Sequence, residues 1–219
     1  MIQPARRLLA AAAGCTLLTP AGAQIDPVPA DASLRWWKGN LHTHTFWSDG
    51  NDFPEMVGEW YRTNGYNFLA LSDHNVMSQG RRWMDVSEVE RRSRGGAMAK
   101  YLARFGEAWV ERRVNEGTGM EEVRLQPFDE YRALLEQRGT FVLFPAEEIT
   151  SAFDRLPVHI NATNVAARVP PQTGQSVEEV IRLTMRAVED HAAEHGREVM
   201  THLNHPNFGY GVRAEDFAR

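Results

Sequence analysis

The sequence predicts a single α/β domain built on a parallel sheet or barrel. Short apolar runs, typical of buried strands, alternate with amphipathic stretches typical of helices. The 219 residues are 42% hydrophobic, which suffices for one sizeable core. Polar clusters directly follow the apolar runs, and in parallel α/β folds the carboxyl ends of the strands carry the active site.

Five strands and two helices are predicted from these patterns. One strand candidate spans 38–45, where Leu41 lies between polar neighbours. The others span 68–71, 141–144, 158–165 and 199–203. One helix is expected over 53–64, where apolar residues recur three and four positions apart. A long amphipathic helix is expected over 176–195, where Ser176 and Glu179 resemble a capping box and Gly196 is a stop signal.

The first 23 residues predict a signal peptide. Arg6 and Arg7 precede an alanine-rich apolar run over 8–18, and a small-x-small pattern then predicts cleavage before Gln24. The apolar run is shorter than the roughly 20 residues that a membrane-spanning helix needs. We therefore expect an exported protein, periplasmic or extracellular, with residues 24–38 as a linker and 39–219 as the folded domain.

The net charge and the cysteine content limit the partners and the metal ligands that the protein can have. Removal of residues 1–23 would lower the net charge from −5 to −7, because the segment holds two arginines and no acidic residue. Such a charge argues against a nucleic-acid partner, which favours a basic surface. Cys15 is the only cysteine, so the cleaved chain would have no disulfide and no thiolate ligand. Alternatively, an acylated Cys15 would anchor a lipoprotein.

Residues 75–140 interrupt the alternating pattern. Within them, residues 75–125 are rich in both basic and acidic side chains and include a Gly95-Gly96 pair. We interpret the segment as a helical insertion over the top face of the sheet. It would act as a lid or form a solvated helical pair, since mixed charge is typical of an exposed face.

Histidines and acidic residues cluster around the predicted strand ends. His42 and His44 would point to the same face of a strand, which suits chelation of one divalent metal, and Asp49 would reach back from the following turn. Imidazole and carboxylate ligands without thiolate suit Zn, Mn or Fe. Further candidates lie beside other predicted strands, and they are His74, Glu148, His159 and His205.

The local motifs around these residues resemble those of the PHP (polymerase and histidinol phosphatase) family. The matching segments occur in the family's order, and they are Leu41-His42-Thr43-His44-Thr45-Phe46-Trp47-Ser48-Asp49-Gly50, Ser72-Asp73-His74-Asn75, Pro145-Ala146-Glu147-Glu148-Ile149-Thr150, His159 and Asn204-His205-Pro206-Asn207. The resemblance implies a distorted (β/α)7 TIM-like barrel that hydrolyses phosphate esters of small substrates at a two- or three-metal centre.

The resemblance also implies roles for individual residues. It favours Glu148 over Glu147 as the carboxylate that bridges two metals and supports catalysis. Asp73 is either a residue that orients a neighbouring ligand or a capping residue at a strand end. The implied metal ligands are His42, His44, Asp49, His74, Glu148, His159 and His205.

Two departures from the family pattern stand out. Ala146 occupies a position that is often glycine. The last Asp-x-His pair of the family has no counterpart in the 14 residues after His205. We therefore expect a chain that is truncated at its C-terminus, or a metal site that is incomplete.

Other readings of the sequence stay open. An amidohydrolase-like enzyme also begins its barrel with His-x-His, and a metal-binding domain without catalysis would need the same ligands. His191 and His195, four residues apart on the long helix, are expected to be solvent-facing rather than ligands. His202 is a candidate to support a ligand from behind.

Overall fold

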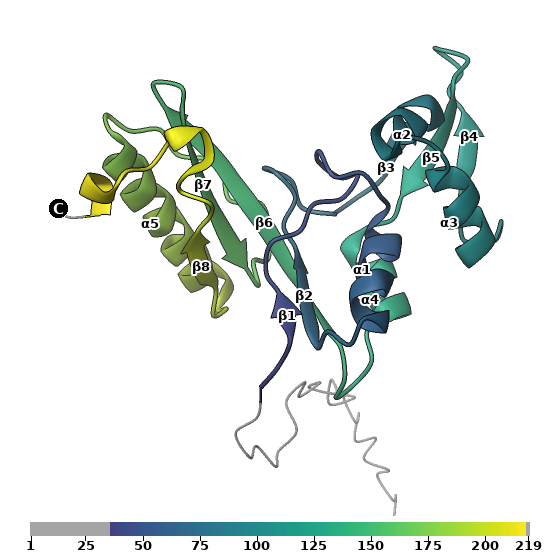
Figure 1. The fold of residues 1–219 in the computed structure, drawn as a ribbon, viewed down its shortest axis with the longest axis horizontal. Coiled ribbons are helices and arrows are strands. Elements are labelled where there is room, and N and C mark those ends of the chain that lie inside the picture. The colour runs from purple at the N-terminus through teal and green to yellow at the C-terminus, as the bar shows by residue number, and fades with distance from the viewer. Residues whose placement is uncertain (1–35, 218–219) are drawn as a thin grey trace, which may run out of the picture.

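The structure, a computed structural model, describes residues 36–217, which form two sheets and five α-helices (Figure 1). The predicted signal peptide (1–23), Cys15 and most of the predicted linker (24–38) lie outside these residues. The strands are β1 (Gly39–Asn40), β2 (Phe68–Leu71), β3 (Arg82–Asp85), β4 (Arg112–Val114), β5 (Glu121–Leu125), β6 (Val142–Phe153), β7 (Leu156–Thr163) and β8 (Met200–Leu203). The helices are α1 (Pro54–Thr63), α2 (Val86–Ser93), α3 (Ala97–Phe105), α4 (Phe128–Leu135) and α5 (Val177–His195), with short 3-10 turns at η1 (Phe208–Tyr210) and η2 (Ala214–Phe217).

The larger sheet is mixed and curled, with strand order β1-β2-β6-β7-β8. β1, β2 and the first four residues of β6 pair in parallel, whereas the rest of β6 pairs antiparallel with β7, and β7 pairs antiparallel with β8. The expected distorted (β/α)7 TIM-like barrel is therefore wrong for this chain. The described residues do not alternate strand and helix throughout, and only part of the sheet is parallel.

The reason for the difference lies in β6. The sequence predicts a strand that ends at Phe144, but β6 is 12 residues long and continues to Phe153. Asp154 and Arg155 then both adopt positive φ angles, 44° and 68°, and return the chain directly into β7. Two such residues form the tight turn that matches the twist of paired antiparallel strands. A hairpin therefore joins these two strands, whereas a parallel pair would need a longer crossover connection.

Helices cover one face of the curled sheet. α1 and α4 pack against β2 and the start of β6 through a cluster that includes Leu69, Leu143 and Tyr131. α5 packs against β6 and β7, where Ile149, Ala162 and Val188 are buried together. Because neighbouring residues of a strand point to opposite faces, the residues between these core positions point to the other, concave face.

Residues 75–140 form more than the expected helical insertion. α2 and α3 are present, but β3, β5 and β4 also form a three-stranded antiparallel sheet. This segment has its own core, in which Val89, Tyr101 and Val123 are fully buried. Phe46 and Phe53 enter the same core from the loop before α1. The insertion is thereby tied to the loop that follows β1.

The two helices predicted from the sequence are confirmed with small shifts of their ends. α5 begins after Ser176, whose Oγ accepts a hydrogen bond from the Glu179 amide at 3.1 Å, and ends at His195, before Gly196 in the left-handed conformation. The predicted strands at 68–71 and 199–203 are also present. Within residues 36–217, we find no helix with the length and apolar character needed to cross a membrane.

Candidate metal centre

The His42-Thr43-His44 segment lies in a loop rather than on a strand, because β1 contains only Gly39 and Asn40. His42 and His44 therefore do not share a strand face as predicted, although the two imidazole rings do lie together, with centroids 4.9 Å apart. The loop is held in place by Ser72, whose amide donates to the Thr43 carbonyl at 2.8 Å. The convergence of the two rings thus depends on the loop and on its contacts with the end of β2.

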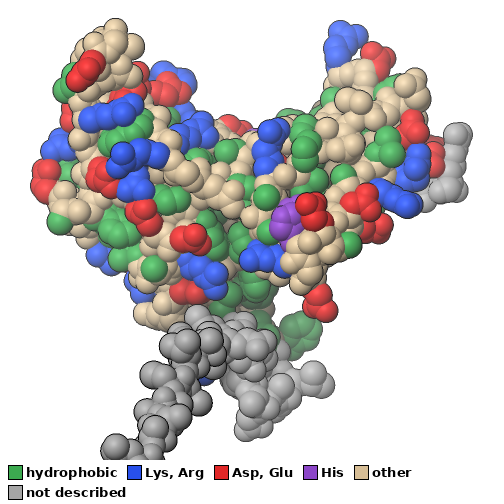
Figure 2. All heavy atoms as spheres, turned by 180° about the vertical axis from the view of Figure 1, so that it is seen from behind, with side chains coloured by type: hydrophobic (Ala, Val, Ile, Leu, Met, Phe, Trp, Pro, Cys, Tyr) green, Lys and Arg blue, Asp and Glu red, His purple; other side chains and the backbone are tan. Residues whose placement is uncertain are grey.

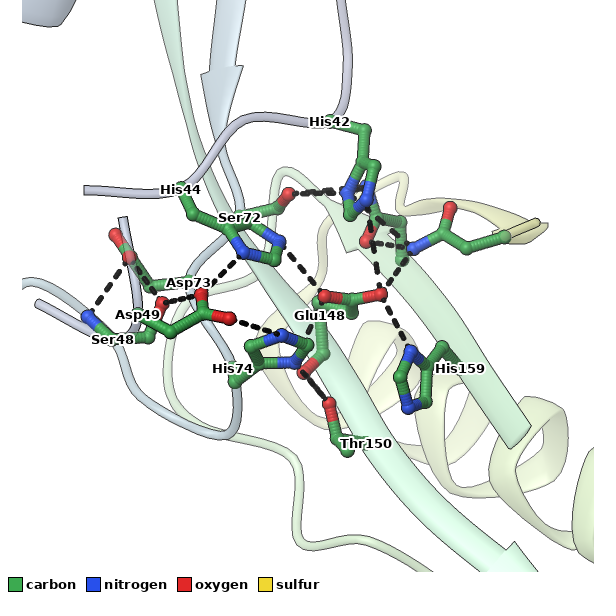
Figure 3. Close-up of polar contacts among 12 residues, drawn as sticks. His42, His44, Ser48, Asp49, Ser72, Asp73, His74, Glu148, Thr150 and His159 are labelled. Atoms are coloured by element: carbon green, nitrogen blue, oxygen red, sulfur yellow. Dashed lines mark hydrogen bonds and ion pairs between the residues drawn. The ribbon is translucent and has the colours of Figure 1, made fainter. Parts of the chain in front are cut away.

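Glu148 occupies the middle of the site (Figure 3). It lies within β6, on the face opposite Ile149, and its side chain is completely buried. The sequence predicts Glu148 just after the end of a strand, whereas it lies inside β6. His74 nevertheless lies beside Glu148. Glu148 donates its amide hydrogen to the Asp73 carbonyl at 3.2 Å, and the Asn75 amide donates to the Glu148 carbonyl at 3.0 Å.

Imidazole nitrogens surround both carboxylate oxygens of Glu148. His44 Nε2 and His74 Nδ1 each lie 2.9 Å from Oε2. On the other oxygen, Oε1, His205 Nε2 lies at 3.1 Å and His159 Nδ1 at 3.2 Å. His42 Nε2 is more distant, 3.8 Å from Oε1. The structure therefore brings all five predicted histidines to this one carboxylate.

Asp49 extends the cluster on the solvent side. Its Oδ1 lies 2.7 Å from His44 Nδ1, and its Oδ2 lies 3.6 Å from His74 Nε2. Unlike Glu148, the Asp49 side chain is 68% exposed. The carboxylate pair therefore places one acidic group inside the cluster and one at its mouth.

Three overlapping groups of these side chains are close enough to hold a metal ion. In each group the candidate ligand atoms lie within 4.8 Å of one another, and the groups are His42, His44 and Glu148; His44, Asp49 and His74; and His74, Glu148 and His159. His205 is outside these groups, although it lies beside Glu148. Six of the seven predicted ligands thus belong to at least one group.

The buried polar atoms of the cluster fit a metal. Among the described residues, His44 Nε2, Glu148 Oε2 and His159 Nδ1 are buried without a hydrogen-bond partner of good geometry. Buried polar atoms normally have such a partner, because an unmet one costs free energy. Imidazole and carboxylate donors that converge in this way would be satisfied by a divalent cation such as Zn, Mn or Fe.

The electrostatic environment keeps Glu148 ionised. Burial alone would raise the pKa of its carboxyl group, but the neighbouring imidazoles of His159 and His44 outweigh burial and hold that pKa below its ordinary value. Burial also lowers the pKa of His44, yet its contacts with Glu148 and Asp49 raise it to about 9. In the metal-free protein His44 thus carries a proton near neutral pH, which a bound metal would replace.

Hydroxyl and amide side chains that the sequence analysis did not single out hold the ligands. Ser72 Oγ lies 3.1 Å from His42 Nδ1, and Thr150 Oγ1 lies 2.5 Å from His74 Nδ1. Asn204 donates to Glu148 Oε1 at 2.9 Å and to Asn161 Oδ1 at 2.7 Å. Such partners orient ligands in metal sites. The available signal was position, since Asn161 is two residues from His159 on one strand and Asn204 precedes His205.

Asp73 acts on the loop that carries the ligands. Its buried carboxylate accepts hydrogen bonds from the amide and hydroxyl of Thr45, both at 2.8 Å. It also accepts from the amide of Ser48 at 3.0 Å and from its hydroxyl at 2.6 Å. These four bonds place the Thr45–Ser48 turn between His44 and Asp49. Asp73 therefore supports the two ligands through the backbone.

The remaining histidines lie in other surroundings. His191 and His195 stack with centroids 4.2 Å apart. His191 Nε2 accepts from the Ala166 amide, and His195 Nδ1 lies 3.0 Å from the His191 carbonyl, so each ring contacts backbone. His202 pairs with Asn161 across β7 and β8, and burial lowers its pKa. The supporting role of His202 stays a prediction.

The cluster lies between two raised parts of the molecule. Figure 2 shows a wide notch between the insertion and the β6–β7 hairpin, and the loop after β1 crosses between them in Figure 1. A cavity of about 730 Å³ opens beside His44, with walls from α1 and α3. Of the seven candidate ligands, His44 alone lines this cavity, so it adjoins the cluster on the side of α1.

No family model matches the chain, and no curated protein is similar to it at a significant level.

Proposed function

We propose that this protein hydrolyses phosphate esters of small molecules at a divalent-metal centre built around Glu148. The observation that carries the proposal is the approach of five imidazoles to both oxygens of one buried carboxylate. A carboxylate with separate ligands on each oxygen is suited to bridge two cations. The motif resemblance to the PHP family adds the reaction type.

The protein's own residues would bind and orient the reacting groups. Bound divalent metals would neutralise the phosphoryl oxygens and lower the pKa of a water molecule at the site. The imidazoles hold Glu148 ionised. Its carboxylate would in turn keep the imidazoles beside its two oxygens at a fixed separation. Asp73 would hold the turn between His44 and Asp49, so that the mouth of the site keeps its shape.

The test is hydrolysis of an aryl phosphate by the purified full chain with added Mn²⁺ or Zn²⁺. We expect turnover that a chelator abolishes and that His44→Ala reduces at least a hundredfold, because this ring contacts both carboxylates of the cluster. His195→Ala is the matched control, since that histidine contacts helix backbone away from the cluster. Its activity should equal that of the wild type.

The outcomes separate the proposal from its rivals. Turnover that survives both chelation and His44→Ala would contradict it. Cleavage of an amide panel without cleavage of phosphate esters would favour an amidohydrolase-like enzyme. Retained metal with no turnover on either panel would favour a metal-binding domain.

A further inference from the structure

A large aromatic side chain stands exposed next to the metal centre. Phe208, on the turn after His205, is 59% exposed, although its ring lies beside two of the candidate ligands. Its centroid is 5.6 Å from that of His159 and 5.4 Å from that of His205. Both of these imidazoles face Oε1 of Glu148. Phe208 therefore presents an apolar surface at one side of the cluster.

The turn that carries Phe208 is held tightly against the start of β7. A Cβ atom added at Gly211 would lie 2.0 Å from the Pro157 carbonyl oxygen, and one added at Gly209 would lie 3.1 Å from the Pro157 ring. At Gly211 only glycine allows so close an approach. The Phe208 amide also donates to the His205 carbonyl at 2.8 Å, and the Val212 amide donates to the Pro206 carbonyl at 3.1 Å.

This arrangement fixes the backbone that carries Phe208, and the ring lies exposed against His159 and His205. A single exposed apolar side chain is common, but one that stands beside a polar cluster gives that surface the composition of a ligand site. Such sites combine aromatic walls with a few convergent polar groups. The phosphoryl group would meet the polar groups around Glu148, and the group esterified to it would meet the ring.

We propose that Phe208 is a specificity-determining residue that receives the organic part of the substrate and favours a planar, apolar one, so that aryl phosphate esters are preferred over small alkyl esters. The inference rests on the proposed function and names its substrate class. Two aromatic rings gain from stacking or edge contact beyond the burial of apolar area. A methyl group offers too little surface to gain either.

The experiment compares the binding of phenylphosphonate and methylphosphonate to the Mn²⁺-loaded full chain by calorimetry. We expect the wild type to bind phenylphosphonate more tightly, and Phe208→Ala to weaken this binding about tenfold while leaving methylphosphonate unchanged. Tenfold corresponds to about 1.4 kcal/mol. Phe208→Leu, which keeps an apolar side chain at the site, should give an intermediate loss and guards against misfolding of the alanine variant.

Tyr210→Asn is the matched control. Tyr210 is on the same turn and 81% exposed, and asparagine suits its positive φ of 53°. It should leave both affinities unchanged, and metal content should be equal in all variants.

Equal weakening of both phosphonates in Phe208→Ala, or loss of metal, would overturn the inference, because Phe208 would then only position its neighbouring imidazoles. A wild type that binds neither phosphonate would overturn the proposed function itself.

Discussion

Glu147 and Glu148 are adjacent acidic residues with opposite surroundings. Glu148 points to the concave face of the sheet and meets the imidazoles, whereas Glu147 points towards α5 and accepts a hydrogen bond from the Val169 amide at 2.8 Å. Burial raises the pKa of Glu147 to about 7, while that of Glu148 is held low by its neighbours. Alternation along a strand explains the contrast. The motif resemblance had favoured Glu148 without this reason.

The metal-binding residues of the site could be predicted from the sequence, but the residues that support them could not. Histidine and carboxylate side chains are metal ligands in any fold that brings them together, so His74 and His159 could be selected from the sequence. Asn204 and Thr150 are common residues whose role depends on which atom they contact in the fold. These contacts depend on the tertiary structure, and a single sequence does not show them.

The loop after β1 is the element on which the cluster most depends. Gly50 has an ordinary φ, so its importance is the close approach of backbone to backbone rather than a left-handed turn. A Cβ atom there would lie 2.5 Å from both the His44 carbonyl carbon and the Thr45 amide nitrogen. Arg92 of the insertion donates a hydrogen bond to the Gly50 carbonyl, which fixes the loop from the other side.

Gly50→Ala is therefore expected to displace His44 and to weaken metal binding about 10- to 100-fold, the range seen when the support of a ligand is lost. Calorimetric titration with Mn²⁺ or Zn²⁺ would measure the change. Gly117→Ala is a suitable control, because a Cβ there meets only the Asn115 side chain, at 3.4 Å. Unchanged affinity in Gly50→Ala would show that the loop tolerates the shift.

The course of strand β6 explains why the predicted barrel was wrong. The apolar run up to Phe144 stops at Pro145 and the polar pair Glu147-Glu148, which resembles the end of a strand in the sequence. The strand continues because the concave face of the sheet is polar, so that Glu148 and Thr150 are correctly placed on it. Helix α5 was predicted well, since its capping residue and its periodic apolar face are local signals.

In the whole molecule, one buried carboxyl group links the insertion to the helix layer. Glu55 of α1 is fully buried, and its Oε1 accepts hydrogen bonds from Tyr101 at 2.5 Å and from Trp109 at 2.9 Å. Burial raises its pKa to about 7, and the hydrogen bond from Tyr101 only partly opposes this. The folded state therefore holds the proton that the unfolded chain releases near pH 4.5.

Stability should consequently fall as the pH rises through the window from about 4.5 to 7, since the folded state binds more protons there. Glu55→Gln removes this titration and mimics the neutral form. We expect the free energy of unfolding of the wild type to fall by roughly 3 kcal/mol relative to Glu55→Gln across that window. Urea denaturation at several pH values would measure the difference. A constant difference between the two proteins would show that Glu55 is ionised in the folded state.

The claim that Glu148 is the centre of a metal site is tested most directly by the metal content of two glutamine variants. Each protein is loaded with Mn²⁺ or Zn²⁺, dialysed and examined by elemental analysis, with circular dichroism as the check of folding. We predict that the wild type and Glu147→Gln retain metal and that Glu148→Gln, equally folded, loses it. Equal metal content in Glu148→Gln and the wild type would contradict the account.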